Sequence, residues 1–260
     1  MTILDKIVEH KKKEVADSKQ QRSIAQLEAS AHFGRTPYSF REFLLAPDRT
    51  GIIAEFKRRS PSKGIINADV LVEDVTQAYA AAGASALSVL TDENFFGGNK
   101  QDVIAARTVN NIPILRKDFM IDEYQVIEAK SIGADIILLI AAILTPAEIK
   151  QLAALAKSLG LNVLLEVHNL EELERSIDDN LDAIGVNNRN LADFTVSVEN
   201  SFKLAAHIPD SFMKISESAI SDTEIIKDLK QAGYNGFLIG ETFMKQPDPG
   251  LAMKAFVKGL

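Results

Sequence analysis

The chain of 260 residues contains no cysteine, which excludes disulfides, thiolate metal sites and cysteine nucleophiles. It also lacks a long apolar run, because the longest, IILLIAAIL at 136–144, is far shorter than the roughly 20 residues that span a bilayer. No apolar segment resembling a secretory signal follows the N-terminus. We therefore expect a soluble, cytoplasmic protein that does not associate with membranes.

Basic residues are outnumbered, with 29 lysines and arginines against 36 aspartates and glutamates. The net charge of −7 argues against a general nucleic-acid-binding surface. An anionic small molecule would need a local basic cluster that acts against the overall field. The four histidines, His10, His32, His168 and His207, are scattered along the sequence. This dispersion predicts no metal site, and we expect no cofactor.

Short β-branched segments alternate with amphipathic helical segments from residue 51 onward. The eight predicted strands cover 51–57, 85–91, 112–117, 134–140, 162–167, 183–187, 212–216 and 236–240. Helical patterns fill the intervals at 69–83, 123–133, 146–160 and 222–233, and each ends in glycine, a common helix stop.

Strict alternation of strands and helices favours a parallel sheet with right-handed crossovers. Eight such units match a (β/α)₈ TIM barrel, for which roughly 250 residues are typical. A doubly wound open sheet is the alternative, but no G-x-G-x-x-G follows the first strand. The composition, 46% apolar and 25% charged, suits a folded α/β domain.

The first 50 residues do not follow this alternation. Segment 2–21 has helical periodicity, with Thr2 and Asp5 in a capping-box pattern, and a second helical segment covers 39–47. We interpret 1–50 as a helical extension packed on a barrel of residues 51–260, so that 1–260 form a single domain. The lysine run at 11–13 is interpreted as a solvated helix face.

Polar residues follow the apolar part of most predicted strands. These are Glu55, Lys57, Lys117, Glu166, Asn187 and Glu217. Alternation puts Lys117 on the face of Leu115 and Glu217 on the face of Ile215, so the polar members would meet at the C-terminal mouth of a barrel. A single such residue is more often a solvated charge or a structural ion pair. Five strands with the same ending favour an acid–base site.

A second group of residues has the character of a phosphate site. Ser218 follows the seventh strand, and Gly240 opens a short helix after the eighth, where barrel enzymes commonly hold phosphate. Arg189 and Ser60 could add charge and a hydroxyl. His168 lies beside the mouth and is either functional or a polar loop residue.

Seven segments together resemble the indole-3-glycerol phosphate synthase family of tryptophan biosynthesis. They are, in chain order, IAEFKRRSPSKG, SVLTDENFFGG, PILRKDFMIDEYQ, LLEVH, IGVNNRNL, KISESAI and FLIGETFM. The resemblance implies a carboxy-lyase that closes the ring of 1-(2-carboxyphenylamino)-1-deoxyribulose 5-phosphate with loss of CO₂ and water. It implies no metal or cofactor.

The resemblance also implies roles for the strand-end residues. Lys117 matches the acid for ring closure, Lys57 matches an acid for dehydration, and Glu55 and Glu166 match candidate bases whose steps stay open. Asn187 and Glu217 match orienting positions. Phe96 and Phe119 match positions against the aromatic ring, and the positions that bind substrate or its phosphate are Ser60, Arg189, Ser218, Gly240 and Glu241.

Two positions depart from the family pattern and put details of phosphate binding in doubt. Ala219 stands where the family usually has glycine, which would strain the chain if this turn needs a positive φ. Glu241 brings a carboxylate to the phosphate end, and it would have to turn away from a dianion.

Two other functions compete with this interpretation. A phosphoribosylanthranilate isomerase-like barrel usually needs a cysteine or aspartate pair, whereas this chain has glutamates and lysines. A non-catalytic barrel that binds a phosphometabolite would not need the full Glu/Lys set. The sequence leaves the oligomeric state open, and nothing in it demands more than a monomer.

Overall fold

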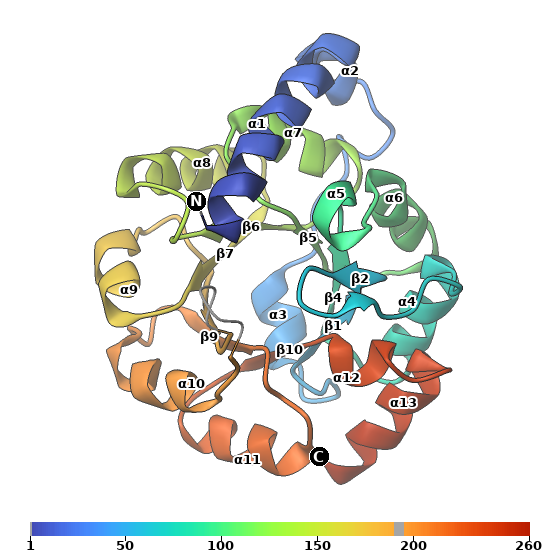
Figure 1. Cartoon of the computed structure of the whole chain (residues 1–260), viewed down its shortest axis with the longest axis vertical. Helices are drawn as coiled ribbons and strands as arrows, with labels where there is room; N and C mark the ends of the chain where they lie inside the picture. Colours follow the sequence, from blue (N-terminus) through green and yellow to red (C-terminus); the bar gives the residue numbers. More distant parts are fainter. Residues whose placement is uncertain (1, 190–194) are drawn as a thin grey trace.

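The computed structural model describes residues 2–189 and 195–260, and within them eight parallel strands close into a barrel with helices around it (Figure 1). The barrel strands are β1 (Ile52–Phe56), β4 (Ala86–Leu90), β5 (Ile114–Lys117), β6 (Ile136–Ile140), β7 (Asn162–Val167), β8 (Ala183–Asn187), β9 (Met213–Glu217) and β10 (Gly236–Ile239). Each strand pairs with its neighbour in chain order, and β10 closes the ring on β1. The predicted (β/α)₈ barrel is confirmed, and the open-sheet alternative is wrong.

The helices that cover the outside of the ring follow the strands in order. They are α4 (Val72–Ala81), α6 (Lys100–Val109), α7 (Glu123–Ser131), α8 (Pro146–Ser158), α9 (Leu170–Ser176), α10 (Glu199–Leu204), α11 (Thr223–Gln231) and α13 (Pro249–Phe256). Two four-residue helices, α5 (Glu93–Phe96) and α12 (Glu241–Met244), lie in the loops after β4 and β10. The loop after β1 folds into an antiparallel pair, β2 (Arg59–Ser60) and β3 (Gly64–Ile65), over the barrel rim. Two 3₁₀ turns, Ala205–His207 and Val257–Gly259, follow α10 and α13.

Both faces of the barrel strands are buried, as expected for a parallel sheet covered by helices. Ile53, Leu115, Leu164 and Ile215 belong to the cluster that fills the barrel interior, whereas their neighbours along each strand pack against the outer helices. Helix α3 (Phe40–Leu45) adds Phe40 and Leu44 to the interior cluster. The alternation of side chains therefore leaves the polar ends of the strands at the opposite, C-terminal mouth.

Helix α1 (Ile3–Gln21) has the predicted capping box, in which Thr2 and Asp5 bond each other's backbone N–H groups. The hydroxyl of Tyr124 on α7 donates to the carbonyls of Ser18 and Arg22, which ties the end of α1 to the barrel. Helix α2 (Ile24–Glu28) also lies against α7.

One prediction for α1 is wrong. Lys12 and Lys13 are exposed, but Lys11 is fully buried. It lies one helical turn from Ile7 and from Val15, which are both buried, and so it shares their inward face. The charge of Lys11 is compensated by acids from elsewhere in the chain, described below.

No helix within residues 2–189 and 195–260 is both long and apolar enough to cross a membrane.

Candidate active site

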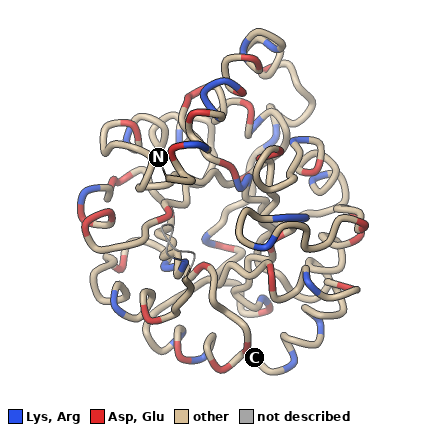
Figure 2. Tube along the Cα trace, viewed as in Figure 1, with Lys and Arg blue, Asp and Glu red and all other residues tan. Residues whose placement is uncertain are grey.

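A cavity of about 490 Å³ opens at the C-terminal mouth of the barrel. All thirteen candidate residues line it: Glu55, Lys57, Ser60, Phe96, Lys117, Phe119, Glu166, Asn187, Arg189, Glu217, Ser218, Gly240 and Glu241. Figure 2 shows acidic and basic residues over the outer helices and a further group inside the ring of strands. The last residues of the motif IGVNNRNL, at 190 and 191, lie outside the described residues.

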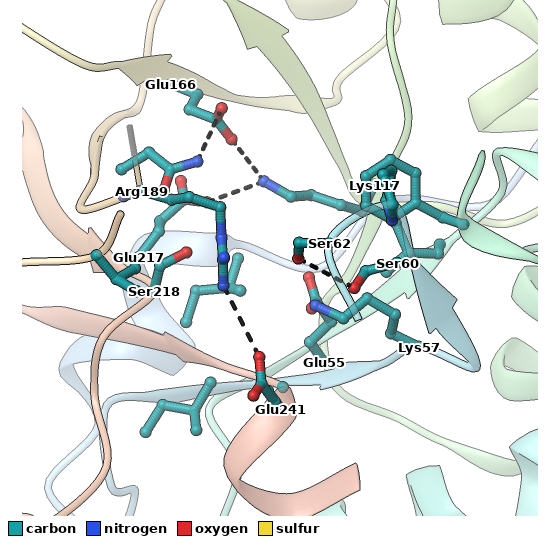
Figure 3. Close-up of a pocket in the computed structure, with 18 of the residues that line it drawn as sticks. Glu55, Lys57, Ser60, Ser62, Lys117, Glu166, Arg189, Glu217, Ser218 and Glu241 are labelled. Carbon is teal, nitrogen blue, oxygen red and sulfur yellow. Dashed lines mark hydrogen bonds and ion pairs between the residues drawn. The ribbon is translucent and has the colours of Figure 1, made fainter. Parts of the chain in front are cut away.

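Lys117 lies between two carboxylates at the centre of the cavity (Figure 3). Its Nζ is 2.7 Å from Oε2 of Glu166 and 2.9 Å from Oε2 of Glu217. Strand register brings the three together, because β8 pairs Gly185 with Glu166 on one side and Asn187 with Glu217 on the other. The side chains come from β5, β7 and β9, which face one another across the barrel.

The charges in this trio shift one another's pKa values. Burial lowers the pKa of Lys117, but Glu166 and Glu217 outweigh burial, so the net shift is upward and the ammonium form is favoured. Burial raises the pKa of Glu217, Lys117 opposes this shift and the Glu166 carboxylate adds to it, so that the pKa of Glu217 lies at about 7. For Glu166, burial is outweighed by Lys117 and His168, and its pKa lies below the ordinary value. One carboxylate of the pair is thus ionised while the other titrates near neutrality.

Asn187 and His168 both contact Oε1 of Glu166, the carboxylate oxygen that does not face Lys117. The amide of Asn187 donates to Oε1 at 3.2 Å, and Nε2 of His168 lies 3.4 Å from the same atom. The other ring nitrogen of His168 contacts Glu172 at 3.1 Å. Burial lowers the pKa of His168, but the two glutamates outweigh it and raise the pKa to about 9. His168 is thus a cationic support of Glu166 beside the cavity.

A second lysine–glutamate pair lies on β1 and its loop. Nζ of Lys57 is 2.5 Å from Oε1 of Glu55, and the Glu55 side chain is buried whereas Lys57 is partly open to the cavity. An acid and a base are unusual on the inward face of a core strand. Because side chains alternate along β1, Glu55 and Lys57 follow Ile53 on that face and lie above it at the mouth.

Two glycines make room for the carboxylates of the cavity. A β-carbon at Gly185 would lie 2.2 Å from Oε1 of Glu217, and one at Gly240 would lie 2.5 Å from Oε1 of Glu55. The role of Gly185 was missed from sequence, since it depends on the register of the neighbouring strand.

An aromatic pair lies at the β4–β5 side of the cavity. The rings of Phe96 and Phe119 are tilted, with centroids 5.9 Å apart. Ile3, Leu4 and Ile7 of α1 line the same cavity. Aromatic and aliphatic side chains therefore form this part of the cavity wall.

The β9–β10 side, across the ring, has the features of an anion site. Ser218 and Ala219 both have positive φ, at 68° and 62°, so the turn does need the left-handed conformation and Ala219 carries its strain. Gly240 precedes α12, as predicted. The hydroxyl of Thr242 donates to the carbonyl of Ile220 at 2.8 Å, which holds this turn against the β10 loop.

Glu241 lies among the cations of this side. Its carboxylate is 3.7 Å from Lys63 and 3.8 Å from Arg189, and Figure 3 shows the Arg189 contact. It therefore does not turn away from the basic groups that a phosphate would use. Ser60 and Ser62 have their hydroxyls 3.5 Å apart on the facing rim. Among the described residues, no group of three or more histidines and acids could hold a metal ion.

Fold and site together define a barrel enzyme that carries out acid–base chemistry on a small anionic substrate. The profile of the indole-3-glycerol phosphate synthase family matches residues 4–256. The chain belongs to this family of carbon–carbon carboxy-lyases of tryptophan biosynthesis, which act on a small phosphosugar substrate.

Individual relatives cover almost the whole chain. An indole-3-glycerol phosphate synthase of Bacteroides thetaiotaomicron is 51% identical over 99% of this chain and 98% of its own length. One from Carboxydothermus hydrogenoformans is 40% identical over 98% of this chain and 99% of its own.

More distant solved structures share the fold alone. The 3-hexulose-6-phosphate synthase of Salmonella typhimurium superposes with a TM-score of 0.62 at 12% identity, covering 81% of this chain and 98% of that one. Thiamine phosphate pyrophosphorylase of Pyrococcus furiosus gives 0.61 at 17% identity, covering 85% and 96%.

Proposed function

We propose that the mouth residues convert 1-(2-carboxyphenylamino)-1-deoxyribulose 5-phosphate to indole-3-glycerol phosphate, with the two lysine–glutamate pairs serving two successive steps. The observation that carries this proposal is the position of Lys117, whose Nζ lies within 2.9 Å of carboxylates from two other strands. An ammonium held in this way stays protonated and points into the cavity.

Ring closure requires a ring carbon to attack the sugar ketone, whose oxygen becomes an alkoxide. Lys117 protonates this oxygen. Although its pKa is raised, an alkoxide is a stronger base than an amine, so the transfer remains favourable. Glu166 holds the lysine in place, and Asn187 and His168 hold Glu166. Loss of CO₂ then restores the aromatic ring.

Dehydration requires an acid for the leaving hydroxyl and a base for the adjacent proton. Lys57 supplies the first and Glu55 the second. Their contact of 2.5 Å lets the proton taken by Glu55 return to Lys57 after each turnover. This assignment leaves Glu166 as the support of Lys117.

The two sides of the cavity fit the two ends of this substrate. Phe96 and Phe119 take the carboxyphenyl ring, and Glu217 and Asn187 orient the sugar hydroxyls. The phosphate lies against the backbone at Ser218 and Gly240, with Arg189 and the hydroxyl of Ser60 as further ligands. Helix α1 of the N-terminal extension completes this cavity, which supports treating 1–260 as one domain that works as a monomer.

The assay uses the carboxyphenylamino-deoxyribulose phosphate and follows the rise of indole fluorescence together with CO₂ release. Turnover of phosphoribosylanthranilate instead would favour an isomerase, and binding without turnover would favour a non-catalytic barrel. Either of those results rejects the proposed function.

A further inference from the structure

The buried lysine of α1 joins two loops of the barrel mouth. Nζ of Lys11 lies 2.8 Å from Oδ1 of Asp118, after β5, and 3.1 Å from Oδ2 of Asp92, after β4. Glu14, on the same helix, contacts it at 2.8 Å. The side chains of Lys11 and both aspartates are completely buried. Lys11 does not line the cavity, so it does not touch the reacting atoms.

Each aspartate also anchors one of the two aromatic residues of the cavity. The backbone N–H of Phe96 donates to Oδ1 of Asp92 at 3.2 Å, and that of Phe119 donates to Oδ1 of Asp118 at 2.8 Å. A single aspartate therefore links Lys11 to each phenylalanine: Asp92 links it to Phe96, and Asp118 links it to Phe119. These two phenylalanines come from different loops, and they meet at a centroid distance of 5.9 Å.

The same helix supplies an apolar wall beside these rings. Ile3, Leu4 and Ile7 line the cavity, and Ile7 lies one turn before Lys11 on the buried face of α1. Figure 1 shows α1 beginning over the barrel rim near β6 and running outward beside α7. A shift of α1 would thus move the wall and release both aspartates.

Burial of a lysine is a costly way to attach a helix. A well-packed apolar residue in place of a buried ion pair is often neutral or stabilising, and in some proteins a buried ion pair is kept because it fixes one arrangement. Asp118 has a second cation, since Arg116 contacts its Oδ2 at 3.1 Å and Thr91 donates to the same atom. Asp92 pairs with Lys11, so the lysine adds a second link between the β4 and β5 loops beside the Thr91–Asp118 hydrogen bond, and it connects both loops to α1.

We propose that Lys11 is a positioning residue that sets the width and tilt of the slot between Phe96 and Phe119, and thereby the affinity for the aromatic end of the substrate. This inference rests on the proposed function for the identity of the ring, and it assigns to the N-terminal helix a share in recognising it.

The test compares two probes that differ by one ring system: indole-3-glycerol phosphate and glycerol 3-phosphate. Calorimetry on Lys11→Met should show affinity for the first weakened about tenfold, the magnitude of a lost aromatic contact, and affinity for the second changed by less than about twofold. In turnover, KM should rise more than kcat falls. Lys13→Met is the matched control, because Lys13 is 71% exposed on the same helix and pairs with Glu9. It should leave both affinities unchanged.

Equal weakening of both probes in a folded Lys11→Met protein, or no weakening of either, would overturn the proposal. If Lys11→Met does not fold, Asp92→Asn decides, because asparagine keeps the acceptor for Phe96 while weakening the contact with Lys11. It should weaken the indole ligand about threefold and spare glycerol 3-phosphate. If Asp92→Asn leaves the ratio of the affinities for indole-3-glycerol phosphate and glycerol 3-phosphate unchanged, the proposal is also overturned. Turnover by the wild-type protein tests the proposed function separately, since the probe ratio requires no catalysis.

Discussion

Gly185 and Glu217 occupy adjoining strands so closely that a β-carbon on the glycine would lie 2.2 Å from Oε1 of the glutamate. The carboxylate of Glu217 also contacts Lys117 through its other oxygen. Because residue 185 is glycine, Glu217 can occupy this position, and Glu217 in turn holds Lys117.

The substitution Gly185→Ala should displace Glu217 and, with it, Lys117. We expect kcat to fall by about 10- to 100-fold, the range for a misplacement near 1 Å in a catalytic site. Gly34→Ala is the matched control, since a β-carbon added at Gly34 would have nothing within 4 Å. Turnover of Gly185→Ala within about twofold of wild type would contradict this interpretation.

Removal of the ring-closure acid should abolish turnover while the barrel still folds. Lys117→Ala takes away the proton donor, and we expect kcat to fall about 10²- to 10⁴-fold in the fluorescence assay. Folding survives because Glu217, with its pKa of about 7, can take up a proton. Lys157→Ala, at a surface pair with Asp182, should behave as wild type. A Lys117→Ala enzyme that keeps more than about a tenth of kcat refutes the acid role.

The charge on His168 should make stability depend on pH. Burial lowers its pKa, but the carboxylates of Glu166, 3.4 Å from Nε2, and of Glu172, hydrogen-bonded to Nδ1, outweigh burial and raise the pKa from 6.5 to about 9 in the folded protein. The folded state thus binds more protons than the unfolded state in this window. The stabilisation, on the order of 3 kcal/mol, is fully present below pH 6.5 and is lost as pH rises through about 9.

His168→Gln should remove this component, so thermal unfolding between pH 6 and pH 10 should show a smaller fall in Tm than the wild type shows. His207→Gln is the control, because His207 is exposed at the end of a 3₁₀ turn. Parallel Tm curves for wild type and His168→Gln would be evidence against a charged His168.

The carboxylate of Glu241 should compete with the substrate phosphate for Arg189 and Lys63. Its contacts of 3.8 and 3.7 Å are partly exposed, so each is worth little. We expect Glu241→Gln to lower KM by about two- to fivefold with kcat unchanged. Glu224→Gln breaks a comparable exposed pair, with Lys227 on α11, and should leave KM unaltered. A higher KM in Glu241→Gln would mean that this carboxylate assists binding.

The left-handed turn at Ala219 should be relieved by glycine. At φ 62° an alanine carries about 1–2 kcal/mol of strain, and the greater freedom of glycine in the unfolded chain offsets part of it, so Ala219→Gly should raise the free energy of unfolding in urea by up to about 1 kcal/mol. Ala46→Gly should have the opposite sign, since Ala46 is extended with φ −61° and glycine there only loosens the unfolded chain. Equal losses of stability in both variants would argue against strain at 219.

Much of the mouth was predictable because one rule governs it. Side chains alternate along a strand, so apolar residues such as Leu115 and Ile215 identify which polar neighbours point inward. Lys117 and Glu217 follow directly, and barrel closure then brings them together. The strand interiors were predicted for the same reason, and the ends differ by one or two residues, where loops replace sheet hydrogen bonds.

Features that depend on two distant segments were not predictable in this way. Gly185 matters through the register of β8 against β9. The burial of Lys11 depends on Asp92 and Asp118, which no local pattern connects to it. Its spacing of four from Ile7 and from Val15 was a signal for an inward face, but a lysine run is more often solvated.

The positions of Asp92 and Asp118 in the sequence determine when, during synthesis, Lys11 of α1 can find its partners. Helix α1 is synthesised before the barrel strands, and Asp118 is added only after roughly a hundred more residues, about 5 to 20 s later at typical rates. During that interval the apolar face of α1 and its lysine have no barrel to enter. The helix that walls the aromatic side of the cavity is therefore made well before the two loops that hold its lysine.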